Sequence, residues 1–122
     1  MDKIPLTIWG RSFDLDVVFD CYRGETPTDV QQRALDNFIA NSNLLDKVRP
    51  EVEMYCKQKD STVITDNIFK FVIPRALFVQ RTKNDLRVIG VMCAFKLDLE
   101  HGLVIVFKNE NFDQIGAQDV IL

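Results

Sequence analysis

SFDLDVVFDCY, residues 12–22, carries the clearest hydrophobic alternation in the chain. Alternate positions are apolar, and the positions between them are mostly acidic or polar, with Val18 as the exception. The apolar positions are Phe13, Leu15, Val17, Phe19 and Cys21. A period of two residues is typical of a strand with one face on a core and the other in water. The segment therefore predicts a half-buried strand that presents Asp14, Asp16 and Asp20 to solvent.

The residues before this strand predict its hairpin partner. Ile4 to Trp9 has the composition of a strand, and Gly10-Arg11 lies between the two segments. A two-residue loop with glycine first is typical of a type II′ turn, because glycine accepts the positive φ that this position needs. We therefore expect an antiparallel hairpin that turns at Gly10-Arg11.

Two helices are expected next. Thr28 and Gln31 match a capping box, in which the hydroxyl accepts an N–H of the first turn and the amide reaches back. An apolar stripe with helical spacing runs through Val30, Ala34, Leu35, Phe38 and Ile39. The second helix is expected from about Leu44 to Lys59, and Pro50 within it predicts a kink or two closely coupled helices.

The second half of the chain is a run of strand-like segments. Ile68–Ile73 fits a short strand or an extended segment that leads into Pro74. The segments that follow are Arg75–Arg81, Leu86–Leu97, Leu103–Lys108 and Phe112–Ile115. Leu86–Leu97 is apolar on both faces, which is typical of a strand in the middle of a sheet. This order predicts one α+β domain over residues 1–122, with a mainly antiparallel sheet and two helices packed on one face.

Composition narrows the class of protein. The chain has 122 residues, of which 47% are apolar, and this is enough for one hydrophobic core without disulfide or metal support. The formal charge of −3 and the isoelectric point near 5.1 argue against nucleic acid and suit a partner with a basic surface. The N-terminus lacks the apolar core of a signal peptide, and no apolar run approaches the roughly 18 residues of a membrane span. We therefore expect a cytoplasmic protein with no membrane partner.

No motif points to a metal, a cofactor or a catalytic centre. The three cysteines are too widely spaced for a zinc or thioredoxin-like motif, so we expect free thiols. His101 could act as a general base held by Glu100. However, no nucleophile motif accompanies it, and a turn at Gly102 explains the same residues. We expect His101 to be structural, and we expect neither an enzyme nor a cofactor-binding protein.

The acidic side of residues 12–22 is the best candidate for a contact surface. On a strand, Asp14 and Asp16 are roughly 6.5 Å apart, and Asp20 lies about 20 Å beyond Asp14. Two neighbouring carboxylates are too few ligands for a divalent cation. A plain solvated face and a protein-contact face are the remaining alternatives, and Tyr22 extends the row with an aromatic anchor. We assign Asp14, Asp16, Asp20 and Tyr22 to partner binding.

Several short motifs resemble a family of small uncharacterised bacterial domains. They are Gln31–Phe38, Ile73-Pro74, Glu100-His101-Gly102-Leu103, Gly116 and Asp119. The resemblance covers about residues 12–122, and the chain has Lys96-Leu97-Asp98-Leu99 where that family usually shows a Trp-Asp pair. Some members of the family occur beside polymorphic toxins as immunity proteins. The resemblance implies a cytosolic bacterial protein that neutralises a toxin by direct binding, and no catalytic residues carry over.

The expected function is therefore that of a non-catalytic binding protein, an immunity protein whose partner is a toxin with a basic active-site cleft. The alternative is a cytosolic domain that binds a small ligand or another protein, and an enzyme that uses His101 and Glu100 comes third. An acidic surface speeds encounter with a basic partner, while a few buried anchors slow release. A second acidic patch, formed by Asp98, Glu100 and Glu110, is the alternative to the row on residues 12–22.

Overall fold

The structure, a computed structural model, describes residues 2–122 as one sheet with two α-helices. The strands are β1 (Lys3–Ile8), β2 (Arg11–Phe19), β3 (Val72–Val79), β4 (Val88–Phe95), β5 (Leu103–Lys108) and β6 (Asn111–Gly116). The helices are α1 (Asp29–Ala40) and α2 (Leu44–Lys59), and short 3-10 helices η1 and η2 cover Ile68–Lys70 and Gln118–Val120. The expected α+β class is confirmed.

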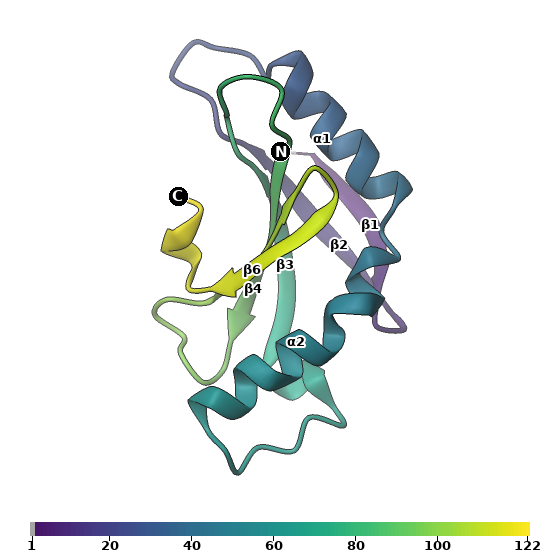
Figure 1. The fold of residues 1–122 in the computed structure, drawn as a ribbon, viewed down its shortest axis with the longest axis vertical. Helices are drawn as coiled ribbons and strands as arrows, with labels where there is room; N and C mark the ends of the chain where they lie inside the picture. The colour runs from purple at the N-terminus through teal and green to yellow at the C-terminus, as the bar shows by residue number, and fades with distance from the viewer. Residues whose placement is uncertain (1) are drawn as a thin grey trace.

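The six strands lie in the sheet in the order in which they occur in the sequence (Figure 1). Every neighbouring pair is antiparallel except β2 and β3, which are parallel. Both helices lie in the connection between these two strands, because a parallel pair needs a long crossover to bring the chain back to the same end. The sheet is therefore a hairpin joined to a four-stranded meander through one parallel ladder.

The register predicted for β2 is confirmed. Leu15 and Val17 are buried in the main core, and Phe13 and Phe19 pack partly against it. Asp14 is exposed and Asp16 is half-buried on the opposite face. A slip of one residue would have exchanged the two sets, so the alternation alone was enough to orient this strand.

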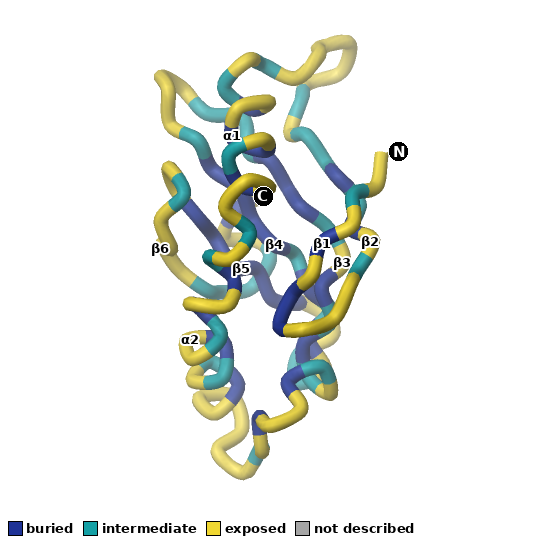
Figure 2. The backbone as a smooth tube through the Cα atoms, turned by 90° about the vertical axis from the view of Figure 1, so that its right-hand side faces the viewer, coloured by how far each residue is buried: buried dark blue, intermediate teal, exposed yellow. Residues whose placement is uncertain are grey.

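Both helices cover the same face of the sheet. Leu35 and Phe38 of α1 and Val52 of α2 belong to one core cluster with the inward side chains of the strands. The rings of Phe38 and Phe107 are 5.3 Å apart, and those of Tyr55 and Phe95 are 5.7 Å apart. Figure 2 shows the buried backbone concentrated in the central strands. β4 lies among them, as its two apolar faces predicted.

A smaller cluster lies on the face away from the helices. It comprises Phe78, Val88, Val104, Val106 and Ile121. Ile121 comes from the C-terminal segment, which folds back over the sheet after β6. A Cβ atom at Gly90 would lie 2.7 Å from the Ile121 Cδ1 atom, so the missing side chain at Gly90 makes room for Ile121.

The structure corrects the position of the first turn. Ile8 pairs with Arg11, so the two-residue loop is Trp9-Gly10 and not Gly10-Arg11. Both loop residues have positive φ, 49° for Trp9 and 83° for Gly10, which is the pattern of a type I′ turn. Trp9 is held there because its ring is buried and its Nε1–H donates to the Leu45 carbonyl oxygen at 2.8 Å.

Both prolines that complicated the sequence interpretation lie inside regular elements. α2 runs through Pro50 as one helix from Leu44 to Lys59. Pro74 lies within β3, where the ladder with β4 shifts register between Pro74 and Ala76. A proline cannot donate to the ladder, and a bulge is one of the places where a strand tolerates it.

Candidate binding surfaces

The carboxylates predicted on β2 lie on the face of the sheet away from the helices. Asp14 is exposed, and it forms no ion pair within residues 2–122. Asp16 contacts Lys3 of the neighbouring strand, with 3.2 Å between the Lys3 Nζ atom and a carboxylate oxygen. The row therefore contains one free carboxylate and one that β1 partly neutralises.

The other two predicted residues, Asp20 and Tyr22, gather around Arg81 just beyond the ends of β2 and β3. An Asp20 carboxylate oxygen accepts the Arg81 backbone N–H at 3.3 Å. The Arg81 guanidinium lies 5.8 Å from the centre of the Tyr22 ring and 3.0 Å from a Glu25 carboxylate oxygen. Tyr22 is nonetheless 75% exposed. Asp14 and Tyr22 are thus the two accessible ends of the predicted surface.

One buried side chain, Gln31, joins the carboxyl ends of the parallel strands β2 and β3. Its Oε1 atom accepts the Thr28 N–H at 2.9 Å, which completes the predicted capping box. Its Nε2 atom donates to the carbonyl oxygens of Asp20 and Val79, at 2.9 and 3.1 Å. The capping box was predictable from Thr28 and Gln31, whereas the two contacts to the ends of β2 and β3 depend on tertiary structure.

His101 is oriented by Asp98 and not by Glu100. The His101 Nδ1 atom lies 3.0 Å from an Asp98 carboxylate oxygen. This hydrogen bond raises the pKa of His101 above its ordinary value and lowers the pKa of Asp98 below its ordinary value. Gly102 follows with φ of +64°, and a Cβ there would lie 2.6 Å from the Gln118 Nε2 atom, so this stretch is shaped by its turn.

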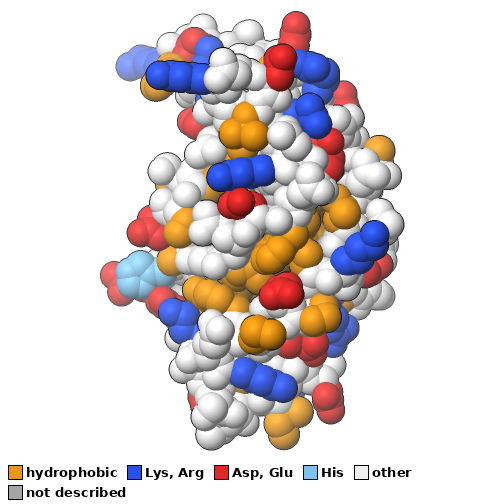
Figure 3. Space-filling view, viewed as in Figure 1, with side chains coloured by type: hydrophobic (Ala, Val, Ile, Leu, Met, Phe, Trp, Pro, Cys, Tyr) orange, Lys and Arg blue, Asp and Glu red, His pale blue; other side chains and the backbone are white. Residues whose placement is uncertain are grey.

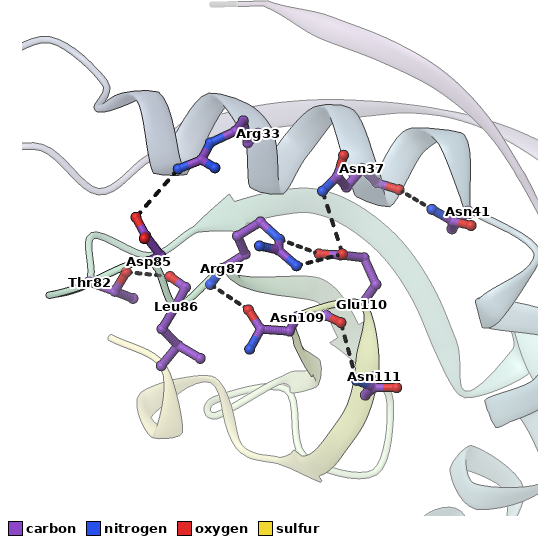
Figure 4. Close-up of polar contacts among 10 residues, drawn as sticks. All are labelled: Arg33, Asn37, Asn41, Thr82, Asp85, Leu86, Arg87, Asn109, Glu110 and Asn111. Carbon is purple, nitrogen blue, oxygen red and sulfur yellow. Dashed lines mark hydrogen bonds and ion pairs between the residues drawn. The ribbon is translucent and has the colours of Figure 1, made fainter.

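A polar network ties α1 to the two neighbouring turns of the sheet (Figure 4). Arg87 donates two parallel hydrogen bonds to the Glu110 carboxylate, at 2.9 and 3.0 Å. Asn37 of α1 reaches the same carboxylate at 3.5 Å, and Arg33 contacts Asp85 at 3.5 Å. The Glu110 charge is therefore neutralised by Arg87. The network joins the helix to the sheet, and this pairing weakens the case for the alternative acidic contact surface that included Glu110.

An open groove lies between α2 and β6, at a place that the sequence did not single out. Its walls are Glu51, Met54, Tyr55 and Gln58 of α2 and Phe112 and Ile115 of β6. The hollow has a volume of about 170 Å³. Met54 is 56% exposed and Phe112 is 38% exposed. Figure 3 shows hydrophobic side chains gathered across the centre of this face with an acidic side chain among them.

The described part of the chain contains neither a cluster of metal ligands nor a reactive thiol in the core. Within residues 2–122, no three histidine, cysteine or acidic side chains are grouped to hold a metal ion. Burial raises the pKa of the Cys56 thiol to about 11 and raises that of Cys93 further. Both are therefore protonated thiols packed in the core. Of the helices in residues 2–122, none has the length and apolar character needed to cross a membrane.

The fold defines an α+β protein with a six-stranded sheet that two helices cover on one face. The chain belongs to the DUF6985 family, a domain of unknown function whose sequence profile matches residues 1–122. This agrees with the expected membership of an uncharacterised domain family. No curated protein and no solved structure matches the chain.

Proposed function

We propose that this chain is a non-catalytic binding protein that neutralises a protein partner by occluding it, as an immunity protein does with its toxin. The observation that carries the proposal is the solvent side of β2, where Asp14 is exposed and Tyr22 stands out beyond the strand end. A carboxylate surface attracts a basic cleft, and an exposed aromatic ring supplies an anchor. The net charge of −3 acts in the same direction.

The counter-charges in the structure refine which residues matter. Lys3 partly neutralises Asp16, and Asp20 accepts a hydrogen bond from the Arg81 backbone N–H, so Asp14 contributes most to the attraction of a basic partner. Tyr22 is held over Arg81, which limits the side-chain freedom that it would lose on binding. Steering should therefore depend on Asp14, and residence time on Tyr22.

A second candidate function, binding of a small ligand, would use the groove between α2 and β6. Small-molecule sites usually enclose roughly 300–1,000 Å³ and bury most of the ligand. The groove has about 170 Å³ and is open, so it holds one large side chain better than a whole ligand. The small size of this hollow supports the proposal of a protein partner over a small ligand.

The test is association kinetics with the purified product of the adjacent upstream gene. The double substitution Asp14→Lys with Asp16→Lys should lower the association rate about tenfold or more at low salt and flatten its salt dependence, because charges at the rim of an interface act mainly on the encounter. The dissociation rate should change little. Tyr22→Ala should instead raise the dissociation rate.

The matched control is Asp36→Lys with Asp66→Lys, which makes the same change in net charge at two exposed residues elsewhere. Equal rates in the two double variants would remove the β2 face from the interface. Absence of binding, together with undiminished toxicity of the neighbouring product when the two are produced together, would refute the immunity function.

A further inference from the structure

The free edge of β6 differs from the other edge of the sheet. β1 carries Pro5, whose nitrogen has no hydrogen to offer to an added strand. β6 contains no proline and lies at the end of the strand order, with only β5 beside it. Exposed strand edges present unpaired N–H and C=O groups on which another chain can pair. Of the two edges, β6 is therefore the one open to strand addition.

The pairing of β6 with β5 identifies the backbone groups that face outward. Lys108 and Asn111 close the two-residue turn, so they form a hydrogen-bonded pair, and the alternation of an antiparallel ladder leaves Phe112 directed outward. The register shift at Asp113 resets this alternation, and Ile115 is again directed outward. No other backbone group within residues 2–122 bonds to either residue.

The same register shift places the side chains of Phe112 and Ile115 on one face. Residues three apart on a regular strand point to opposite faces, but a bulge between them reverses that rule. Phe112 is opposite Phe107 and Ile115 is opposite Ile105, and both of those partners belong to the core that the helices cover. Both side chains therefore line the groove below α2.

We propose that the edge of β6, together with the groove beside α2, binds an extended segment of another protein that carries a large apolar side chain flanked by lysine or arginine. A strand paired with β6 directs every second side chain to the face of Phe112 and Ile115, and so into the groove against Met54. A liquid water occupies roughly 30 Å³, so a hollow of about 170 Å³ accepts one leucine-sized side chain in place of several waters.

The charge of the segment follows from Glu51 in the groove wall. Glu51 forms no ion pair within residues 2–122, not even with Lys47 one turn earlier on α2. Two other nearby cations are already paired with other carboxylates, since Arg49 contacts Glu53 and Lys108 contacts Asp113. A cationic side chain two residues from the apolar anchor lies on the same face of the added strand and can reach Glu51.

The bulge also makes this edge selective. A flat strand cannot pair continuously across Asp113, so backbone hydrogen bonds form only at the two outward-directed residues. Affinity then depends on the side chain in the groove and on the charge near Glu51. This surface is separate from the carboxylates of β2, so this proposal and the proposed function can fail independently.

The test uses two end-capped synthetic peptides, Thr-Lys-Thr-Leu-Thr-Lys-Thr and Thr-Glu-Thr-Leu-Thr-Glu-Thr, titrated into the full chain and followed by amide NMR shifts. The lysine peptide should bind roughly three- to fivefold more tightly, as expected for a partly screened charge pair. The largest shifts should occur at Phe112, Ile115 and Met54. A lysine peptide that is N-methylated at alternate residues should lose binding, because it cannot pair with β6.

Two variants separate the proposal from nonspecific attraction. Glu51→Lys should reverse the preference, so that the glutamate peptide binds more tightly, and this reversal cannot result from unfolding. The control Asp36→Lys, at an exposed position of α1, should leave the preference for lysine unchanged. Equal binding of the methylated and unmethylated peptides, shifts confined to other strands, or no binding of the lysine peptide at millimolar concentration would each overturn the proposal.

Discussion

Gln31 shows how much of the fold can depend on a single polar side chain. It is buried, with 1% of its surface exposed, and it belongs to a residue type that is mostly found at the surface. The burial is tolerable because its amide is fully used, with Oε1 on the cap of α1 and Nε2 on the carbonyl oxygens at the ends of β2 and β3. The amide therefore joins three elements at the point where the parallel ladder ends.

The first prediction concerns the two donors of this amide. Gln31→Glu keeps the shape of the side chain but replaces the NH₂ group by an oxygen that faces two carbonyl oxygens. We expect a loss of about 3 kcal/mol in the free energy of unfolding at pH 7, because a buried charge is left without compensation. Urea unfolding measures it, with Gln32→Glu, at an exposed position of the same helix, as the control.

The pH dependence of this variant follows from the sign of the shift. Burial beside carbonyl oxygens would raise the folded-state pKa of the new carboxyl above its unfolded value near 4.3. The penalty is then largest above the folded-state pKa, and it decreases as the pH falls through that value, since the protonated acid can donate one hydrogen bond. Equal urea midpoints for Gln31→Glu and Gln32→Glu at pH 7 would contradict the role assigned to this side chain.

The C-terminal segment acts as a cover for the second face of the sheet. Its anchor is Ile121, which is 2% exposed and fills the space above Gly90. Three hydrogen bonds accompany the anchor. The Gln80 side chain donates to the Ile121 carbonyl oxygen, and the Gln118 side chain donates to the Cys93 carbonyl oxygen. The Gln118 backbone N–H donates to the His101 carbonyl oxygen. Ile121 is therefore the buried apolar contact that, together with these hydrogen bonds, holds the segment on this face.

The second prediction tests that anchor with a double-mutant cycle. Ile121→Ala should cost about 2 kcal/mol, at the lower end of the range for buried isoleucine, because a segment near the chain end can adjust. Gly90→Ala should cost about 1–3 kcal/mol, since its new methyl group would collide with Ile121 and with Val104. The two costs should be non-additive by about 1 kcal/mol, as expected for residues in contact.

The reference pair for the cycle is Gly90→Ala with Leu122→Ala. Leu122 is next in the sequence but 75% exposed, so its coupling to Gly90 should be close to zero. Free energies of unfolding from urea titrations supply all the terms. If Gly90 couples equally to Leu122 and to Ile121, the cover is not anchored as described.

The type and orientation of individual strands could be predicted from the local hydrophobic pattern. The order in which the strands pair could not. The alternation of residues 12–22 was enough to orient β2, and the two apolar faces of residues 86–97 were enough to place β4 inside the sheet. The turn at Trp9-Gly10 was displaced by one residue, because the burial of Trp9 by α2 decides which residue adopts positive φ. The parallel pairing of β2 with β3 has no local signal, since the two strands are joined only through both helices.

We propose two partner-binding surfaces on the molecule as a whole, and the sequence predicted one of them. Asp14 and Tyr22 stand out in a strand pattern because they are polar or aromatic at solvent-facing positions. The groove between α2 and β6 combines residues about 60 positions apart, and it needs the register shift at Asp113 to bring Phe112 and Ile115 together. Neither condition is visible before the sheet is assembled.

The parallel ladder between β2 and β3 has a consequence for the order of folding. Asp16 pairs with Ala76, so forming this contact closes a loop of sixty residues, which costs about 3–4 kcal/mol of chain entropy in addition to a constant. The antiparallel neighbours β3, β4, β5 and β6 close much shorter loops. The meander should therefore form early, and the N-terminal hairpin should dock late and detach first. Native-state hydrogen exchange should show amides of β1 and β2 opening at a lower free energy than those of β4, and uniform protection across all strands would mean that the sheet opens only as one cooperative unit.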